Sequence, residues 1–150
     1  MMLIMLLMAS VYDIIKGIVP NLLTYSGIFI GLLGGLTERE TTGFLHLTGM
    51  LAGGGLFFLI WVLKGVGGGD VKLMAAVGAF VGWPAVVDAV FFTALWGGVL
   101  ALMFVVWKKA PVVIENGQEK VQPRMKQKMP YAVAITLGTL TPQALAFFLR

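Results

Sequence analysis

Long apolar segments constrain this chain more than any other feature, because a helix needs about 20 apolar residues to cross the hydrocarbon core of a membrane. Six segments have this character. The fourth is short, and it could be either a buried helix or a re-entrant segment packed inside protein. The sequence therefore predicts an all-α membrane protein with about six transmembrane helices. The expected spans are close to residues 1–17, 20–36, 44–63, 70–82, 84–107 and 130–149.

Composition supports a membrane location for the whole chain. Hydrophobic residues make up 59% of the 150 residues and charged residues only 12%, whereas a soluble domain has roughly 25% charged residues. We expect residues 1–150 to form one membrane-embedded domain. The apolar start lacks the basic stretch of a signal peptide, so we interpret it as a membrane helix. No cysteine occurs in the sequence, which excludes disulfides, thiol catalysis and cysteine–zinc sites from it.

The distribution of basic residues predicts the orientation in the membrane. Nine of the eleven fall on the side reached after the first, third and fifth spans, which indicates the cytoplasmic side. The N-terminus is therefore expected outside, and the basic loop 108–129 inside, where it either contacts anionic lipid head groups or is simply solvated. The net charge of +4 does not indicate nucleic-acid binding, because no basic-aromatic stripe accompanies it. The nine residues are Lys16, Lys64, Lys72, Lys108, Lys109, Lys120, Arg124, Lys126 and Lys128.

Two aspartates are placed where a carboxylate is costly. Asp13 lies about 6 Å inside the inner end of the first span, and Asp70 begins the fourth span. Counting the spans puts both at the inner face, whereas the other acidic residues fall in loops or near the outer interface. An ionisable residue within a membrane is a candidate functional residue whose partner should be named. At this depth each aspartate has only the other as an acidic partner.

Two carboxylates held together can share a proton, because both cannot comfortably ionise. One can then take a proton from a water molecule while the other donates to the carbonyl under attack, which is aspartic-protease chemistry and needs no metal or cofactor. Helix dipoles favour the anion for Asp70 and the neutral acid for Asp13, so we expect Asp70 to be the ionised member. Gly67 and Gly69 would permit positive φ and close approach of an extended peptide.

Each aspartate also has an ordinary structural explanation. Asp70 could be a helix N-cap after a glycine turn. Asp13 could be an interfacial carboxylate paired with Lys16 or Lys72. Lys72 itself could tune the carboxylate pair, bind the substrate backbone or anchor its helix at the interface.

Several neighbouring residues are candidates for shaping the site. Pro20 and Asn21 are expected to form the turn into the second span, with direct substrate contact as the alternative. Pro130 and Tyr131 would either pack near the site or simply begin a helix with an interfacial aromatic residue. His46 lies near the outer end of the third span and is expected to be structural.

Three stretches resemble, in order, the motifs of the prepilin peptidases, the type IV leader peptidases, which are GxGD membrane aspartyl proteases. They are "YDIIKGIVPNLLT" (12–24), "GGGDVKLMAAVGAFVG" (67–82) and "MPYAVAITLG" (129–138). The resemblance implies that Asp13 and Asp70 are the catalytic pair. It also implies cleavage of the short basic leader of prepilin, Flp-type or preflagellin precursors at the cytoplasmic face. Without the cysteine-bearing N-terminal region, the chain is similar to the short form of the family.

Other classes of protein also use intramembrane carboxylates. A transporter or proton-relay protein would place them near the bilayer midplane and in repeated halves, and no repeat is visible. A presenilin-like protease is suggested by Tyr12-Asp13 together with GxGD, but the early Pro20-Asn21 fits it less well. A non-enzymatic subunit of a secretion machine would keep the fold without needing both carboxylates.

Overall fold

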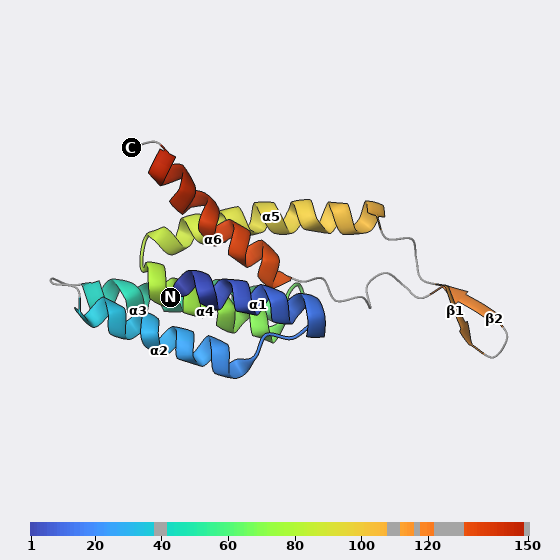
Figure 1. Cartoon of the computed structure of the whole chain (residues 1–150), viewed down its shortest axis with the longest axis horizontal. Helices are drawn as coiled ribbons and strands as arrows, with labels where there is room; N and C mark the ends of the chain where they lie inside the picture. Colours follow the sequence, from blue (N-terminus) through green and yellow to red (C-terminus); the bar gives the residue numbers. More distant parts are fainter. Residues whose placement is uncertain (38–41, 108–111, 116–117, 122–130, 149–150) are drawn as a thin grey trace.

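A bundle of six helices accounts for most of the described chain (Figure 1). The structure is a computed structural model, and it describes all residues except 38–41, 108–111, 116–117, 122–130 and 149–150. The elements in chain order are α1 (Met2–Lys16), α2 (Asn21–Thr37), α3 (Thr42–Val62), α4 (Gly68–Val81), α5 (Ala85–Trp107), β1 (Val112–Glu115), β2 (Gln118–Val121) and α6 (Tyr131–Phe148).

The short helix α4 lies at the centre of the bundle and contacts each of the other five helices described. Its 14 residues span about 21 Å at 1.5 Å per residue, less than the hydrocarbon core of a membrane. Half of them are fully or almost fully buried, including Leu73, Met74 and Val77. Of the two alternatives for the fourth apolar segment, the structure therefore contains the short buried helix.

Small residues let the neighbouring helices approach α4 closely. A Cβ atom on Gly78 would overlap the backbone of Gly49 in α3, and one on Gly31 of α2 would lie 2.8 Å from the carbonyl carbon of Ala79. At the end of α4 away from Asp70, His46 is buried and its Nδ1 lies 2.7 Å from the carbonyl oxygen of Ala79. This carbonyl is in the last turn of α4, where it lacks an intrahelical donor. His46 therefore has the structural role expected from its position.

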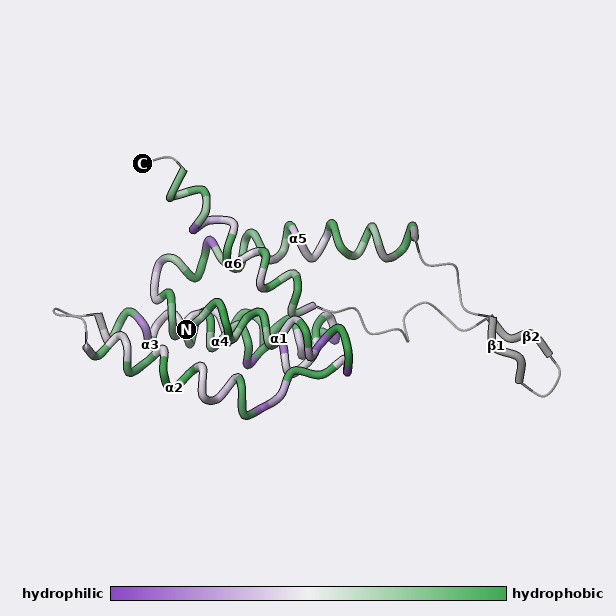
Figure 2. Tube along the Cα trace, viewed as in Figure 1, coloured by the Kyte–Doolittle hydropathy of each residue, from purple (hydrophilic) through white to green (hydrophobic). Residues whose placement is uncertain are grey.

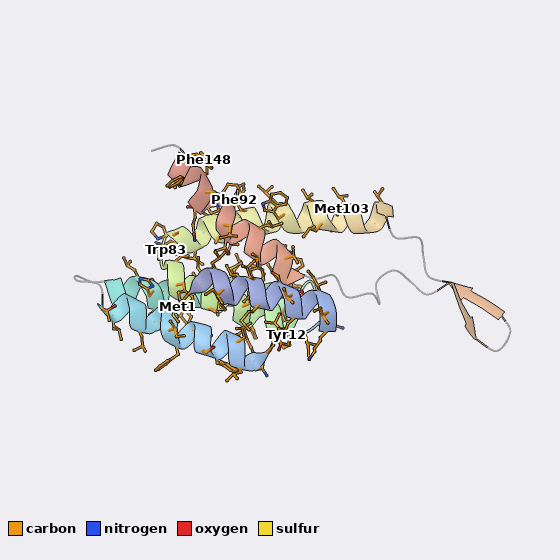
Figure 3. All side chains as sticks on the ribbon, in the orientation of Figure 1. Met1, Tyr12, Trp83, Phe92, Met103 and Phe148 are labelled. Carbon is orange, nitrogen blue, oxygen red and sulfur yellow. The ribbon has the colours of Figure 1, made fainter. Side chains whose placement is uncertain are left out.

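The outer surface of the bundle is apolar, as lipid contact requires. Large hydrophobic side chains such as Phe29, Phe44 and Phe91 are more than half exposed. Figure 2 shows hydrophobic residues along every helix. Met103 on α5 and Phe148 at the end of α6 carry exposed side chains (Figure 3). The chain is thus an all-α, polytopic membrane protein.

Helix lengths refine the expected number of spans. Among the described residues, three helices are long and apolar enough to cross a membrane: Gly43–Val62, Ala85–Met103 and Tyr131–Phe148. Helices α1, α2 and α4 have 15, 17 and 14 residues, which is shorter than a full perpendicular crossing. They pack with the longer helices in one bundle, as Figure 1 shows.

The loop 108–129 contains a hairpin that the sequence analysis did not predict. Strands β1 and β2 pair antiparallel, with Val112 opposite Val121 and Glu115 opposite Gln118. The intervening sequence Asn116-Gly117 is typical of a two-residue hairpin turn. The predicted cytoplasmic location of this loop depends on its basic residues, most of which lie outside the described part of the chain.

Candidate active site

Asp13 and Asp70 line the same open cavity, although they come from different helices and lie far apart in the sequence. The cavity has a volume of about 650 Å³ and opens at the end of the bundle where α1 ends and α4 begins. Its wall also includes residues of the loops that follow α1 and α3, of α5 and of α6. The remaining lining residues are Gly17, Ile18, Val19, Lys64, Gly65, Val66, Gly67, Gly68, Gly69, Gly97, Gly98, Ala101 and Tyr131.

The carboxylate of Asp13 is held by helix α6. Its Oδ2 accepts a hydrogen bond of 3.0 Å from the backbone N–H of Ala132, the second residue of α6. The side chain is buried, with 9% of its surface exposed. Just beyond it, α1 ends at Gly17, whose left-handed φ of 63° lets its N–H donate to the Asp13 carbonyl at 2.8 Å. This end of α1 is marked by Tyr12 in Figure 3.

Polar contacts one turn away from Asp13 join the same two helices. The hydroxyls of Ser10 and Thr136 lie 2.8 Å apart, and Ser10 also donates to the Ala132 carbonyl at 3.3 Å. Thr136 donates back to the Leu6 carbonyl at 3.2 Å. Buried hydroxyls in a membrane helix need such partners, so these contacts fix the register of α1 on α6. That register places Asp13 against the first turn of α6.

Asp70 is held at the start of its own helix. It is the third residue of α4, and its Oδ2 accepts a 3.0 Å hydrogen bond from the N–H of Gly67, the N-cap residue. Only 7% of its surface is exposed. The sequence analysis offered Asp70 as the N-cap residue in its structural alternative. That position is wrong, because the N-cap is Gly67, three residues earlier. Asp70 instead supplies the side-chain acceptor that returns to the N-cap in a capping box.

Both carboxylates therefore accept a hydrogen bond at the N-terminal end of a helix, which changes the contrast expected between them. The sequence analysis assigned Asp13 to the C-terminal, negative end of α1 and so favoured its neutral form. The hydrogen bond from Ala132 adds the positive end of α6 at the same carboxylate. The helix dipoles thus give no reason to choose Asp70 as the only ionised member of the pair.

The glycines before Asp70 act through their size and not through positive φ, contrary to one expectation. Gly67 has φ −81°, and the positive-φ glycines among the described residues are Gly17 and Gly82. A Cβ on Gly67 would lie 3.1 Å from the Asp70 Oδ2, and one on Gly69 would lie 3.2 Å from the Val19 Cβ. Both glycines therefore permit the close packing that surrounds the carboxylate.

The candidates Lys72 and Asn21 lie together outside the cavity wall. Lys72 Nζ donates to Asn21 Oδ1 at 2.9 Å and lies 5.0 Å from the centre of the Tyr25 ring. Pro20 directly precedes α2, and its carbonyl accepts from the Thr24 N–H at 3.3 Å. This group joins α4 to the start of α2.

The basic residues offered as alternative partners for Asp13 have other neighbours in the structure. Lys72 bonds to Asn21, and Lys16 Nζ lies 5.3 Å from the centre of the Tyr12 ring. Asp13 itself is bonded to a backbone amide of α6. The interfacial ion pair therefore does not explain why Asp13 is buried.

Other parts of the site come from α5 and α6. Tyr131 lines the cavity, packs edge-on against Phe57 at 6.4 Å between ring centres, and lies within electrostatic reach of Asp70. A Cβ on Gly97 would lie 2.7 Å from the Tyr131 hydroxyl oxygen, so the glycine makes room for it. Sequence reasoning placed Tyr131 near the site as one alternative but missed Gly97. The signal available was the Gly97-Gly98 pair within an otherwise bulky apolar helix.

Fold and site together define a helical membrane protein with two buried carboxylates in one cavity at one end of its bundle. Residues 1–102 match the model of the type IV leader peptidase family, so the chain belongs to that family. This confirms the family predicted from the sequence. The match includes the first two motifs, whereas the third, at residues 129–138, lies beyond it. The match ends before α6, which nevertheless supplies the amide that holds Asp13.

Similar proteins include prepilin leader peptidase/N-methyltransferases from several bacteria. The protein of Pectobacterium carotovorum subsp. carotovorum is 36% identical over 106 residues, covering 66% of this chain and 38% of its own. That of Burkholderia pseudomallei is 32% identical over 108 residues, covering 65% and 34%. That of Aeromonas hydrophila is 31% identical over 100 residues, covering 60% and 33%. The matched region spans only about a third of each relative, and no solved structure matches the chain.

Proposed function

We propose that this chain is a membrane aspartic endopeptidase that cleaves the leader peptide from type IV pilin-like precursors at the cytoplasmic face of the cell membrane. The observation that carries the proposal is that Asp13 and Asp70 line one cavity and are each held by a backbone amide of a helix N-terminus. The printed names of the relatives, prepilin leader peptidase/N-methyltransferase, supply the class of substrate.

In the proposed reaction the two carboxylates share one proton. The ionised member removes a proton from a water molecule, and the resulting hydroxide attacks the scissile carbonyl. The protonated member donates its proton to the carbonyl oxygen, giving a neutral tetrahedral intermediate. When the C–N bond breaks, the leaving nitrogen takes the proton that the first carboxylate received from water. One hydroxyl of the intermediate returns its proton to the other carboxylate as the new carbonyl bond forms. The pair then again holds a single proton and is ready for the next substrate.

The amides that hold the carboxylates suit this chemistry. Each amide donates to one oxygen, Oδ2, of its carboxylate, which holds the group in the cavity. Fixing the carboxylates in advance lowers the cost of organising them during the reaction. The cavity volume is within the range of about 300–1,000 Å³ that is typical of ligand pockets.

The cytoplasmic face is favoured by the charges near the cavity. Lys16 ends α1, Lys64 lies in the loop after α3, and Lys72 lies in the first part of α4, so the three fall at the same end of the bundle as the aspartates. Basic residues are enriched on the cytoplasmic side of membrane proteins. The same placement argues against a proton relay, whose carboxylates are expected near the bilayer midplane.

The test is cleavage of a pilin-like precursor by the detergent-purified protein and its Asp13→Asn, Asp70→Asn and double variants. Asn keeps the size of Asp and an acceptor oxygen, so folding should survive while proton transfer fails. Residues that act as one unit are strongly non-additive, so each single variant should lose nearly as much activity as the double variant. Substantial turnover by either folded single variant would contradict the proposal and favour a non-enzymatic subunit or a different catalytic apparatus.

A further inference from the structure

Lys64 adopts a backbone conformation that normally calls for glycine. It follows α3 and has φ 60°. Among the described residues it is the one residue other than glycine with a positive φ. Its N–H donates to the Trp61 carbonyl at 2.8 Å, and the next N–H, of Gly65, donates to the Ile60 carbonyl at 2.9 Å. These two bonds form a Schellman motif, in which the left-handed position is most often glycine.

Glycine is abundant on this segment but does not occupy the left-handed position. Positions 65, 67, 68 and 69 are all glycine, and none of them has positive φ. The side chain at position 64 is therefore present despite an unfavourable backbone conformation. Residues held in such conformations are concentrated at functional sites, where the side chain is needed at that place.

The position of Lys64 indicates what its side chain is for. It lies in the wall of the cavity that contains Asp13 and Asp70. Among the described residues that line this wall, Lys64 is the one basic residue. Lys72 provides a contrast, because it lies outside the wall and donates to Asn21. An ammonium group offers three donors on a flexible stem and binds oxygen acceptors, whereas the two aspartates offer acceptors only.

We propose that Lys64 is a substrate-binding residue whose ammonium donates to a backbone carbonyl oxygen of the extended peptide bound in the cavity. The inference rests on the proposed peptidase function and deepens it. A carbonyl near the scissile bond is present in every peptide substrate, so this contact positions the chain without reading its sequence. The positive charge also disfavours a basic leader on the side of the cavity where Lys64 lies, which gives the bound peptide a direction.

The test compares Lys64→Gly, Lys64→Arg and, as a control, Lys16→Gln, a basic residue at the same end of the bundle but outside the cavity wall. Cleavage of a pilin-like precursor gives kcat and KM, and thermal unfolding in detergent gives Tm. Glycine relieves the left-handed conformation, so Lys64→Gly should melt at the same or a higher temperature. Its KM should nevertheless rise by at least about tenfold, the loss expected for a hydrogen bond to a charged group. Lys64→Arg and Lys16→Gln should stay near the wild-type KM.

A binding measurement separates this inference from the proposed function. A fluorescently labelled peptide spanning the leader junction of a pilin-like precursor is titrated into the Asp13→Asn/Asp70→Asn variant with and without Lys64→Gly. Weaker binding by at least about tenfold with Lys64→Gly supports the inference, even if the wild type proves not to be a peptidase. Unchanged affinity, or a loss confined to kcat, overturns it and leaves Lys64 as a helix cap only.

Discussion

Replacing Asp13 by alanine should destabilise the protein more than replacing it by asparagine, although neither variant should cleave. The reason is the buried hydrogen bond from the Ala132 N–H to the Asp13 carboxylate, 3.0 Å long. Asparagine retains an acceptor oxygen at this place and is as good a helix cap as aspartate. Alanine leaves the first turn of α6 without its acceptor from α1.

The size of the difference can be estimated from this one contact. Loss of a side-chain cap costs about 1 kcal/mol, and up to about 2 kcal/mol in well-formed cases. A buried hydrogen bond to an ionised group is worth about 1.5–3 kcal/mol, but alanine also removes the cost of burying a carboxylate. We therefore expect Asp13→Ala to lower the free energy of unfolding by about 1–2 kcal/mol relative to Asp13→Asn. For a chain of this length that is a fall in Tm of about 2–8 °C.

The assay is thermal unfolding of the two detergent-purified variants, followed by tryptophan fluorescence. Ser26→Ala is a suitable control, because the Ser26 hydroxyl is exposed and donates within its own helix, to the Leu23 carbonyl at 3.1 Å. It should shift the free energy of unfolding by less than about 0.5 kcal/mol. Equal melting temperatures for Asp13→Ala and Asp13→Asn would refute the reasoning, because the contact with α6 would then contribute nothing to stability.

Three further predictions concern the metal requirement, the topology and the packing. Cleavage should survive EDTA, because the two aspartates supply both the acid and the base; inhibition reversed by added metal would exclude this mechanism. Reporter fusions at Asn116 and Arg39 should lie on opposite sides of the membrane, with Asn116 cytoplasmic; the same side for both would contradict the charge argument. Gly78→Ala should cost about 1–3 kcal/mol, because the new Cβ overlaps the backbone of α3. In Gly34→Ala the new Cβ meets no atom within 4 Å, so this variant should be more stable by up to about 1 kcal/mol because alanine has the higher helix propensity. If Gly78→Ala and Gly34→Ala shift Tm in the same direction, the packing explanation is wrong.

The helices could be predicted from the sequence because apolar runs and the residues that end them are local signals. Helix α4 begins within the glycine run that precedes Asp70, and α1 is capped by Gly17 in the left-handed conformation. Helix–helix partners are not local. Nothing in the apolar pattern indicates that α1 packs on α6, because that contact depends on hydroxyl pairs such as Ser10 and Thr136. The hairpin was missed because a loop between two spans was treated as irregular.

The candidate site could be predicted in part, for a related reason. Counting spans gives the depth of each residue, and this was enough to predict that Asp13 and Asp70 lie close together. Both line one cavity in the structure. It could not show which groups hold them. The donor to Asp13 is a backbone amide of Ala132, and a backbone amide has no sequence signature. The left-handed conformation of Lys64 was equally hidden, because the glycines around it appeared sufficient for every tight turn.

The contact between Asp13 and α6 also has a consequence for biosynthesis. The two bonded residues are 119 positions apart in the chain. At about 5–20 residues per second, a ribosome needs about 6–24 s to travel that distance. In the later part of this interval, after residue 70 has been added, a nascent chain contains both aspartates but not the amide that fixes the first of them. A translation product that stops before α6 would therefore lack the backbone amide that holds the Asp13 carboxylate.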